Sequence, residues 1–148
     1  QANAHALLGA LVPMKPPKPV RIAFTGHRDK SASVSNLRAI AEEFPGALWV
    51  HGGANEGFDE QVRSFAKAFG IAQEIIRPDY ARYPPKVAPL IRNELIVNGA
   101  ELLVACYDGR LKGGTVYTIR YAEKHGVPVR ILLPADQLLK VTSTSGDL

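Results

Sequence analysis

The amino-acid sequence predicts an α/β fold in three layers, with a five-stranded parallel sheet and helices on both faces. Short apolar runs alternate with segments in which apolar residues recur at helical spacing. Helices of about 10–15 residues between strands indicate right-handed crossovers, and these join parallel strands. Three apolar runs also end directly in small-residue loops, which begin at Thr25, Gly52 and Tyr107. A parallel sheet brings all three loops to one edge.

The first strand and helix are predicted from residues 20–44. Val20–Phe24 is a short apolar strand. An apolar stripe of helical period then runs from Val34 through Leu37 and Ala41 to Phe44. Pro45-Gly46 ends this helix, because proline cannot continue it.

The second strand is Ala47–His51, and a second helix follows it. Its stripe runs from Phe58 to Phe69, and Gly70 is the expected left-handed cap. Ile71–Ile76 is the third strand. Residues 77–86 contain three prolines and are predicted to be a loop.

Two further helix–strand units complete the pattern. The third helix begins near Pro89 and runs to Asn98-Gly99, and Leu102–Cys106 is the fourth strand. The fourth helix extends from about Gly114 to His125 with Gly126 as its cap, and Val127–Leu132 is the fifth strand. The natural strand order is 3-2-1-4-5, a Rossmann-like arrangement with its switch point between the first and fourth strands.

Domain organisation follows from the limits of this pattern. Residues 1–19 are predicted to be an extension in which Ala6–Val12 could form a short docking helix, residues 20–133 one Rossmann-like domain, and residues 134–148 a tail, polar and frayed from Val141. The 148 residues carry a formal charge of +4, which favours anionic ligands without indicating a nucleic-acid protein. We expect a cytoplasmic protein with no membrane span, and we expect Cys106 to be a packed core residue.

Two glycine-rich turns open predicted helices and suit a phosphate. Gly52-Gly53-Ala54-Asn55 precedes the second helix, and Lys112-Gly113-Gly114-Thr115 opens the fourth. Unpaired amides and the positive end of the helix dipole attract anions there. Either turn alone could be a tight turn that only needs glycine. Neither a Walker A motif nor a Gly-x-Gly-x-x-Gly fingerprint occurs.

Polar side chains at the same sheet edge are candidate ligand contacts. Thr25, Gly26, His27 and Arg28 follow the first strand, and an arginine fork matches phosphate oxygens. His51 could equally be a structural histidine. The histidine spacing gives no zinc site, and we expect no metal or cofactor.

Later residues add to this set of candidates. Arg92 and Asn93 lie one turn into the third helix, and Asp59 lies in the first turn of the second, where a carboxylate favours the dipole with or without a ligand. Tyr107 and Asp108 follow the fourth strand. Asp108 could hold ribose hydroxyls or serve acid–base chemistry, or it could be only the turn residue of Asp-Gly.

These motifs occur together in one known superfamily. Gly26-His27-Arg28, Gly52-Gly53-Ala54-x-x-Gly57-x-Asp59, Ile91-Arg92-Asn93 and Tyr107-Asp108-Gly109 through Gly114-Thr115 resemble the SLOG superfamily of Rossmann-like nucleotide-binding proteins, in particular its YspA-like branch of small proteins of unknown function. The resemblance covers roughly residues 20–133. It implies binding of a nucleotide or nucleotide-derived phosphate, and it implies homo-oligomers.

Two relatives within that superfamily imply alternatives. The Lonely Guy phosphoribohydrolases hydrolyse the N-glycosidic bond of nucleoside monophosphates and carry the pattern Gly-Gly-x-Gly-Thr-x-x-Glu, but Thr118 stands where that glutamate would be. If this chain were such an enzyme, Asp108 or Glu56 would polarise water and Arg92 would hold the phosphate. The resemblance to DNA-processing protein A implies single-stranded DNA binding, for which Tyr80, Arg82 and Tyr83 are the only candidates. We expect those three residues to form a lid instead.

The preferred interpretation is a nucleotide-binding domain of the sensor or carrier type. Gly26–Arg28 and Gly52–Asn55 would take the phosphate, and Gly113–Thr115 would close the anion site. Arg92 would add charge and Asp108 would hold the ribose. We also expect at least a dimer, because the third and fourth helices carry apolar residues beyond one core face: Leu90, Val97, Tyr117 and Tyr121.

Overall fold

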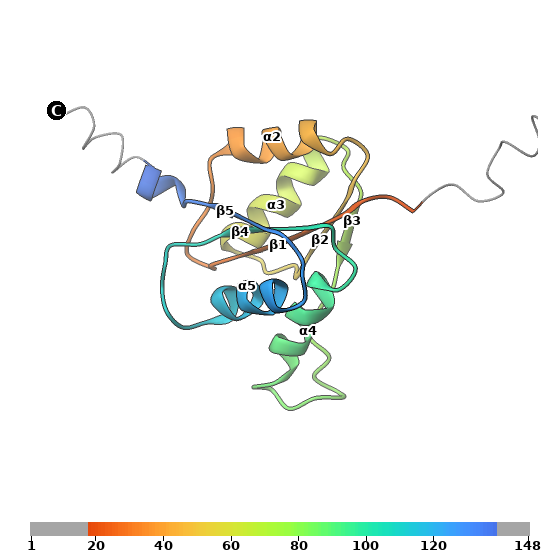
Figure 1. Cartoon of the computed structure of the whole chain (residues 1–148), viewed down its shortest axis with the longest axis vertical. Helices are drawn as coiled ribbons and strands as arrows, with labels where there is room; N and C mark the ends of the chain where they lie inside the picture. Colours follow the sequence, from red (N-terminus) through yellow and green to blue (C-terminus); the bar gives the residue numbers. More distant parts are fainter. Residues whose placement is uncertain (1–17, 139–148) are drawn as a thin grey trace, which may run out of the picture.

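Five parallel strands form one sheet of order β3-β2-β1-β4-β5 in the computed structural model, which describes residues 18–138. The elements are β1 (Arg21–Gly26), α2 (Val34–Glu43), β2 (Leu48–His51), α3 (Gly57–Ala68), β3 (Gln73–Ile75), α4 (Ala88–Val97), β4 (Leu102–Cys106), α5 (Gly114–Lys124) and β5 (Val129–Leu132). Helices α2 and α3 cover one face of the sheet, and α4 and α5 cover the other (Figure 1). The predicted α/β fold and strand order are confirmed. The expected helix at Ala6–Val12 and the tail from Val141 lie outside the described residues.

Two hydrophobic layers hold the helices to the sheet. Successive side chains of a strand point to opposite faces, so Ile22 and Phe24 pack toward α2 and α3 while Ala23 packs toward α4 and α5. Trp49 is fully buried in the first layer, with its ring stacked on Phe65 at 5.6 Å between centroids. Cys106 is buried in the same layer, and burial raises the pKa of its thiol to about 12, as expected for a core residue.

Glycine caps end α3 and α5 as predicted, and they explain why two strands begin later than expected. Gly70 and Gly126 have φ values of 67° and 75°. The next residue in each case donates its amide back to the helix, Ile71 to Ala66 and Val127 to Ala122. These residues close the helix ends, so β3 starts at Gln73 and not at Ile71, and β5 starts at Val129.

Close backbone approach fixes the loop after β1 against α3. β1 extends two residues beyond the predicted end, because Gly26 pairs with Cys106 of β4. A Cβ on Gly26 would lie 2.5 Å from the Cβ of Phe58, and one on Gly57 would lie 2.4 Å from the carbonyl oxygen of Arg28. The Phe58 amide also donates to the carbonyl of His27 (3.2 Å).

Residues 134–138 continue the structure past the predicted boundary at 133. Pro134 forms an antiparallel bridge with Ala32, and the Ala135 amide donates to the Ser31 carbonyl (2.8 Å). Lys30 pairs with Asp136 at 2.9 Å. This segment therefore braces the loop after β1.

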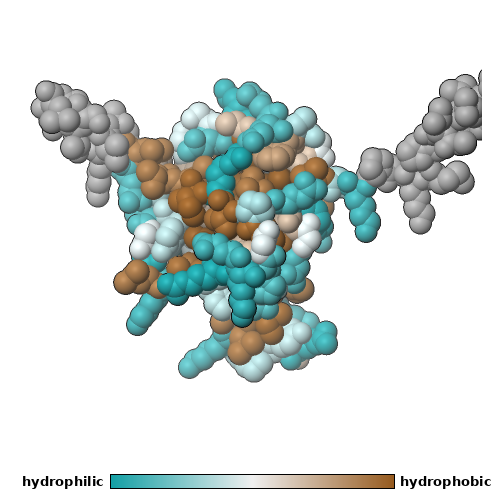
Figure 2. All heavy atoms as spheres, in the orientation of Figure 1, coloured by the Kyte–Doolittle hydropathy of each residue, from teal (hydrophilic) through white to brown (hydrophobic). Residues whose placement is uncertain are grey.

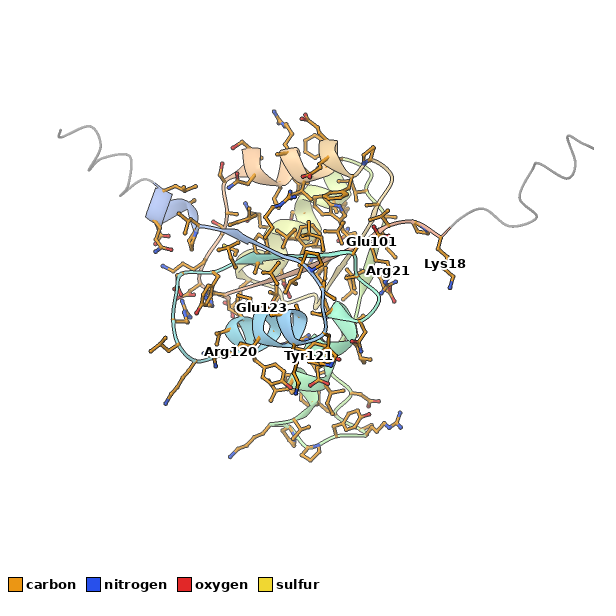
Figure 3. All side chains as sticks on the ribbon, viewed as in Figure 1. Lys18, Arg21, Glu101, Arg120, Tyr121 and Glu123 are labelled. Carbon is orange, nitrogen blue, oxygen red and sulfur yellow. The ribbon has the colours of Figure 1, made fainter. Side chains whose placement is uncertain are left out.

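The two ends of the sheet differ in character. At the amino end, Arg21 lies near Glu101 (Figure 3) and pairs with Glu74 at 2.6 Å. The loops after β1, β2 and β4 are at the opposite, carboxyl end. Figure 2 shows hydrophobic residues gathered over edge strand β5, where Ile131 is 44% exposed and Leu133, the residue after the strand, is 41% exposed. None of the described helices is long and apolar enough to cross a membrane.

Candidate anion-binding site

A cavity of about 460 Å³ lies at the carboxyl edge of the sheet, at the switch point between β1 and β4. Ligands of open α/β sheets bind at this point, and the volume is within the range of small-molecule sites. The lining residues are Phe24, Thr25, Gly26, His27, Arg28, Asp29, Gly52, Ala54, Asp59, Pro89, Arg92, Asn93, Ile96, Arg110, Lys112, Gly113, Gly114 and Thr115.

Most of the residues that the sequence singled out meet in this cavity. Thr25 to Arg28, Gly52, Ala54, Asp59, Arg92, Asn93 and Gly113 to Thr115 all line it. Five candidates lie outside the lining: Gly53, Asn55, Glu56, Tyr107 and Asp108. The sequence reasoning missed Asp29 and Arg110. Arg110 contacts Asp29, which lies 81 residues away in the sequence, and no local sequence pattern predicts such a contact.

The amino terminus of α5 is open toward the cavity. Its cap residue, Gly113, has φ 121° and ψ 177°, a backbone conformation that residues other than glycine rarely adopt. Among residues 18–138, no side chain caps this helix end. The first amides of a helix have no partner within the helix, so those of α5 remain available to an anion.

The loop before α3 is different, because neighbouring side chains accept hydrogen bonds from two of its amides. The Gly53 amide donates to Nδ1 of His51 (3.1 Å), and the Ala54 amide donates to Oδ2 of Asp59 (3.3 Å). His51 is fully buried, and its Nε2 bonds Gln73 Oε1 at 2.7 Å, which fits the structural interpretation of this histidine. Two of the amides expected to hold phosphate are therefore already used.

Arg92 is a half-buried cation in the cavity wall. Its Nη1 donates to the carbonyl of Gly52 (3.1 Å), and its Nε donates to Oδ1 of Asn93 (2.9 Å). Within the described part of the chain it forms no ion pair of 4 Å or less. Burial lowers the pKa of Arg92, and the nearby Asp59 opposes this shift. The guanidinium retains donors for a bound anion.

The charges of the lining are predominantly positive. Arg28, Arg92, Arg110 and Lys112 face two carboxylates, Asp29 and Asp59. Arg110 is already engaged, since its Nη2 lies 2.6 Å from Asp108 Oδ2 and 3.2 Å from Asp29 Oδ1.

Asp108 is held as an ion-paired carboxylate. Hydrogen bonds from the Arg110 side chain hold the pKa of Asp108 far below its ordinary value. Its Oδ1 lies 3.1 Å from Nε2 of the buried His27, and its amide donates to the same nitrogen (3.3 Å). Burial lowers the pKa of His27, although Asp108 opposes the shift. A carboxylate this acidic is a poor proton donor or acceptor near neutral pH.

The depressed pKa of His27 predicts a pH-dependent stability. An unfolded histidine titrates near pH 6.5, so the unfolded chain binds more protons than the folded one just below this pH. Stability contributed by neutral His27 is complete above about pH 6.5 and falls as pH is lowered toward the folded pKa. His27→Gln keeps an acceptor for the Asp108 amide without titrating, so its unfolding free energy should change less between pH 7 and pH 5. Urea titrations check this, with exposed His125→Gln as control. Parallel profiles for wild type and His27→Gln would contradict it.

The side chain of Thr118 points into the protein interior and away from the cavity. It is buried, and its Oγ1 donates to the Gly114 carbonyl (2.6 Å). Thr118 does not line the cavity. Thr118, which stands where the phosphoribohydrolases carry glutamate, therefore stabilises the first turn of α5.

One residue of the expected oligomer surface is part of the core. Val97 is fully buried in the layer between α4, α5 and the sheet, so its predicted place beyond the core face is wrong. Tyr121 projects from α5 beside α4 (Figure 3), and its hydroxyl donates to Asn98 Oδ1 (2.8 Å). Tyr117 bonds Glu94 of α4 in the same way. Both tyrosines join the two helices of this layer.

The fold and the cavity define a class: a parallel α/β protein with a polar, mainly cationic cavity at the switch point of its sheet. No protein-family model matches the chain, and no curated protein matches it either.

Proposed function

We propose that the cavity binds a nucleotide or another nucleotide-derived phosphate ligand, as a sensor or carrier domain of the SLOG type. The observation that carries this proposal is Arg92, a half-buried guanidinium without an ion pair among residues 18–138, in a cavity onto which the uncapped end of α5 opens. The charge of Asp59, which lies more than 4 Å away, offsets the burial of Arg92 only in part, and a phosphate would supply a directly paired counter-charge.

The phosphate is assigned to the α5 end of the cavity. Gly113, Gly114 and Thr115 supply the helix terminus, and Lys112 supplies a further cation. The Gly53 and Ala54 amides near α3 are occupied by His51 and Asp59. This revises the sequence-based hypothesis, which placed the phosphate mainly on Gly26–Arg28 and Gly52–Asn55.

The hydrolase alternative has less support from the cavity. Of its three proposed catalytic residues, only Arg92 lines the cavity. Glu56 is exposed at the start of α3, and Asp108 is paired with Arg110. Thr118 replaces the glutamate of the phosphoribohydrolases and is buried.

A ligand panel separates these functions. Thermal unfolding would be measured with nucleoside monophosphates, ADP-ribose, NAD and cyclic nucleotides, and the ligands would then be recovered by chromatography. A ligand at 100 times its Kd adds about 2.7 kcal/mol to stability, which gives a clear melting shift. We expect a shift with the ligand intact. Released base would indicate a glycosidase, and no shift with any ligand would contradict the proposal.

Gly114→Ala should separate ligand binding from folding. A Cβ at this position would face Asn93 Nδ2 at 3.4 Å, an ordinary contact, and alanine favours a helix over glycine. We expect unchanged or slightly higher thermal stability. The added methyl group would stand where a phosphate approaches the α5 amides, so AMP affinity should fall by about tenfold or more. Calorimetric titration of AMP checks this, with Glu123→Ala on the exposed face of α5 as control. Undiminished AMP binding would place the phosphate elsewhere.

A further inference from the structure

Asp59 is a cavity carboxylate with unused hydrogen-bonding capacity. Of the two acidic residues in the lining, Asp29 is paired with Arg110 (3.2 Å). Asp59 forms no ion pair of 4 Å or less within the described chain, where its one hydrogen bond comes from the Ala54 amide to Oδ2 (3.3 Å). Burial raises the pKa of Asp59, and the Ala54 hydrogen bond and the charge of Arg92 oppose that shift. A carboxylate offers about four acceptor positions, so most of those on Asp59 remain free.

The surroundings of Asp59 divide the cavity into two parts. Arg92 and Asp59 lie against the same residue, because a Cβ on Gly52 would be 2.7 Å from Arg92 Nη1 and 3.1 Å from Asp59 Oδ2. On the other side, the Gly114 Cβ position is 3.4 Å from Asn93 Nδ2, and Asn93 Oδ1 accepts from Arg92. An anion suits the α5 part, and a group that donates hydrogen bonds suits the Asp59 part.

The lining gives little support for stacking a nucleobase. Phe24 is its only aromatic side chain other than His27, and that ring is fully buried. It packs against Trp49 at 4.5 Å and Phe58 at 6.3 Å between ring centroids. A polar lining with one free carboxylate fits hydroxyl groups better than a flat aromatic base.

We propose that Asp59 accepts hydrogen bonds from the sugar hydroxyls of the ligand, so that the cavity selects a sugar phosphate and does not read the base. This inference rests on the proposed function, because it assumes that a phosphate occupies the α5 part. The sequence suggested that Asp108 holds the sugar hydroxyls. The present inference gives that role to Asp59 instead. Asp108 is held by Arg110 and lies outside the lining.

Calorimetric titration of the full chain tests this with four probes: inorganic phosphate, ribose 5-phosphate, AMP and 2′,3′-dideoxy-AMP. On the wild type we expect ribose 5-phosphate and AMP to bind about equally. Both should bind about tenfold more tightly than 2′,3′-dideoxy-AMP, because hydrogen bonds to a charged group are lost with the hydroxyls. In Asp59→Asn, the preference for AMP over its dideoxy analogue should shrink, because a neutral amide oxygen accepts weaker hydrogen bonds than a carboxylate. Inorganic phosphate should bind more tightly because a like charge is removed. Glu123→Gln is the control and should retain the wild-type pattern.

The outcomes distinguish this inference from the proposed function. Equal binding of AMP and 2′,3′-dideoxy-AMP to the wild type would overturn the role of Asp59 while leaving the phosphate site intact. AMP binding far tighter than that of ribose 5-phosphate would show that the base is read, and would overturn the inference also. Failure of all four probes to bind would overturn the proposed function itself. The wild-type comparison does not depend on the folding of any variant.

Discussion

Arg92→Met is expected to weaken AMP binding by about 100-fold or more while leaving the free energy of unfolding within about 1 kcal/mol of the wild type. The guanidinium would supply charge-assisted hydrogen bonds to the phosphate, and methionine supplies none. In the absence of ligand, however, burial of the Arg92 cation opposes folding, as its lowered pKa indicates. Methionine retains the apolar stem without the buried charge, which offsets the lost bonds to Gly52 and Asn93.

Calorimetric titration of AMP and urea unfolding measure the two effects of Arg92→Met separately. Arg130→Met is a matched control, because Arg130 lies on β5, pairs with Glu43 and does not line the cavity. This control should bind AMP like the wild type. If Arg92→Met retained full affinity, the unpaired guanidinium would not be the anion contact, and the proposed function would lose its main support.

Gly57→Ala is expected to lower the free energy of unfolding by about 3–4 kcal/mol. Gly57 has φ 70°, and its added Cβ would lie 2.4 Å from the carbonyl oxygen and 2.5 Å from the Cα of Arg28. These are backbone atoms and cannot rotate away. The loop after β1 would have to move from α3, which would also disturb the bond from the Phe58 amide to the His27 carbonyl.

Gly46→Ala separates the steric effect from the effect of the dihedral angle. Gly46 has φ 77°, yet nothing lies within 4 Å of its Cβ position. Only the left-handed backbone disfavours alanine there, so the loss should be about 1 kcal/mol. Urea unfolding of both variants gives the difference. Equal losses would show that the contact between Gly57 and Arg28 does not constrain the loop.

The sheet could be predicted because its signals are local. Strand-length apolar runs, helical stripes and the glycines at 70 and 126 each specify a short segment, and the crossover rule then fixes parallel pairing. Helix periodicity shows which residues share a face without showing which face meets the sheet. Val97 was misplaced for that reason, and it lies in the core.

The cavity was predicted in outline, but its internal pairing was not. Strand ends at one edge predict which loops meet, and most candidate residues do line the cavity. Which side chain satisfies which partner depends on contacts far apart in the sequence. Arg110 forms ion pairs with Asp108 and Asp29, so Asp108 is not free to contact a ligand. Asp59 accepts a hydrogen bond from the Ala54 amide. These contacts shift the expected phosphate position from α3 to α5.

The most direct test of the account is a nitrogen-15 NMR titration of the full chain with AMP and, separately, inorganic phosphate. We predict the largest amide shifts at Gly113, Gly114 and Thr115 with both ligands, since a phosphate would accept hydrogen bonds from these groups. Smaller shifts should appear around Gly52 and Asp59 with AMP alone. Shifts confined to the outer face of α4 and α5, or no shifts at millimolar ligand, would contradict an anion site at the switch point of the sheet.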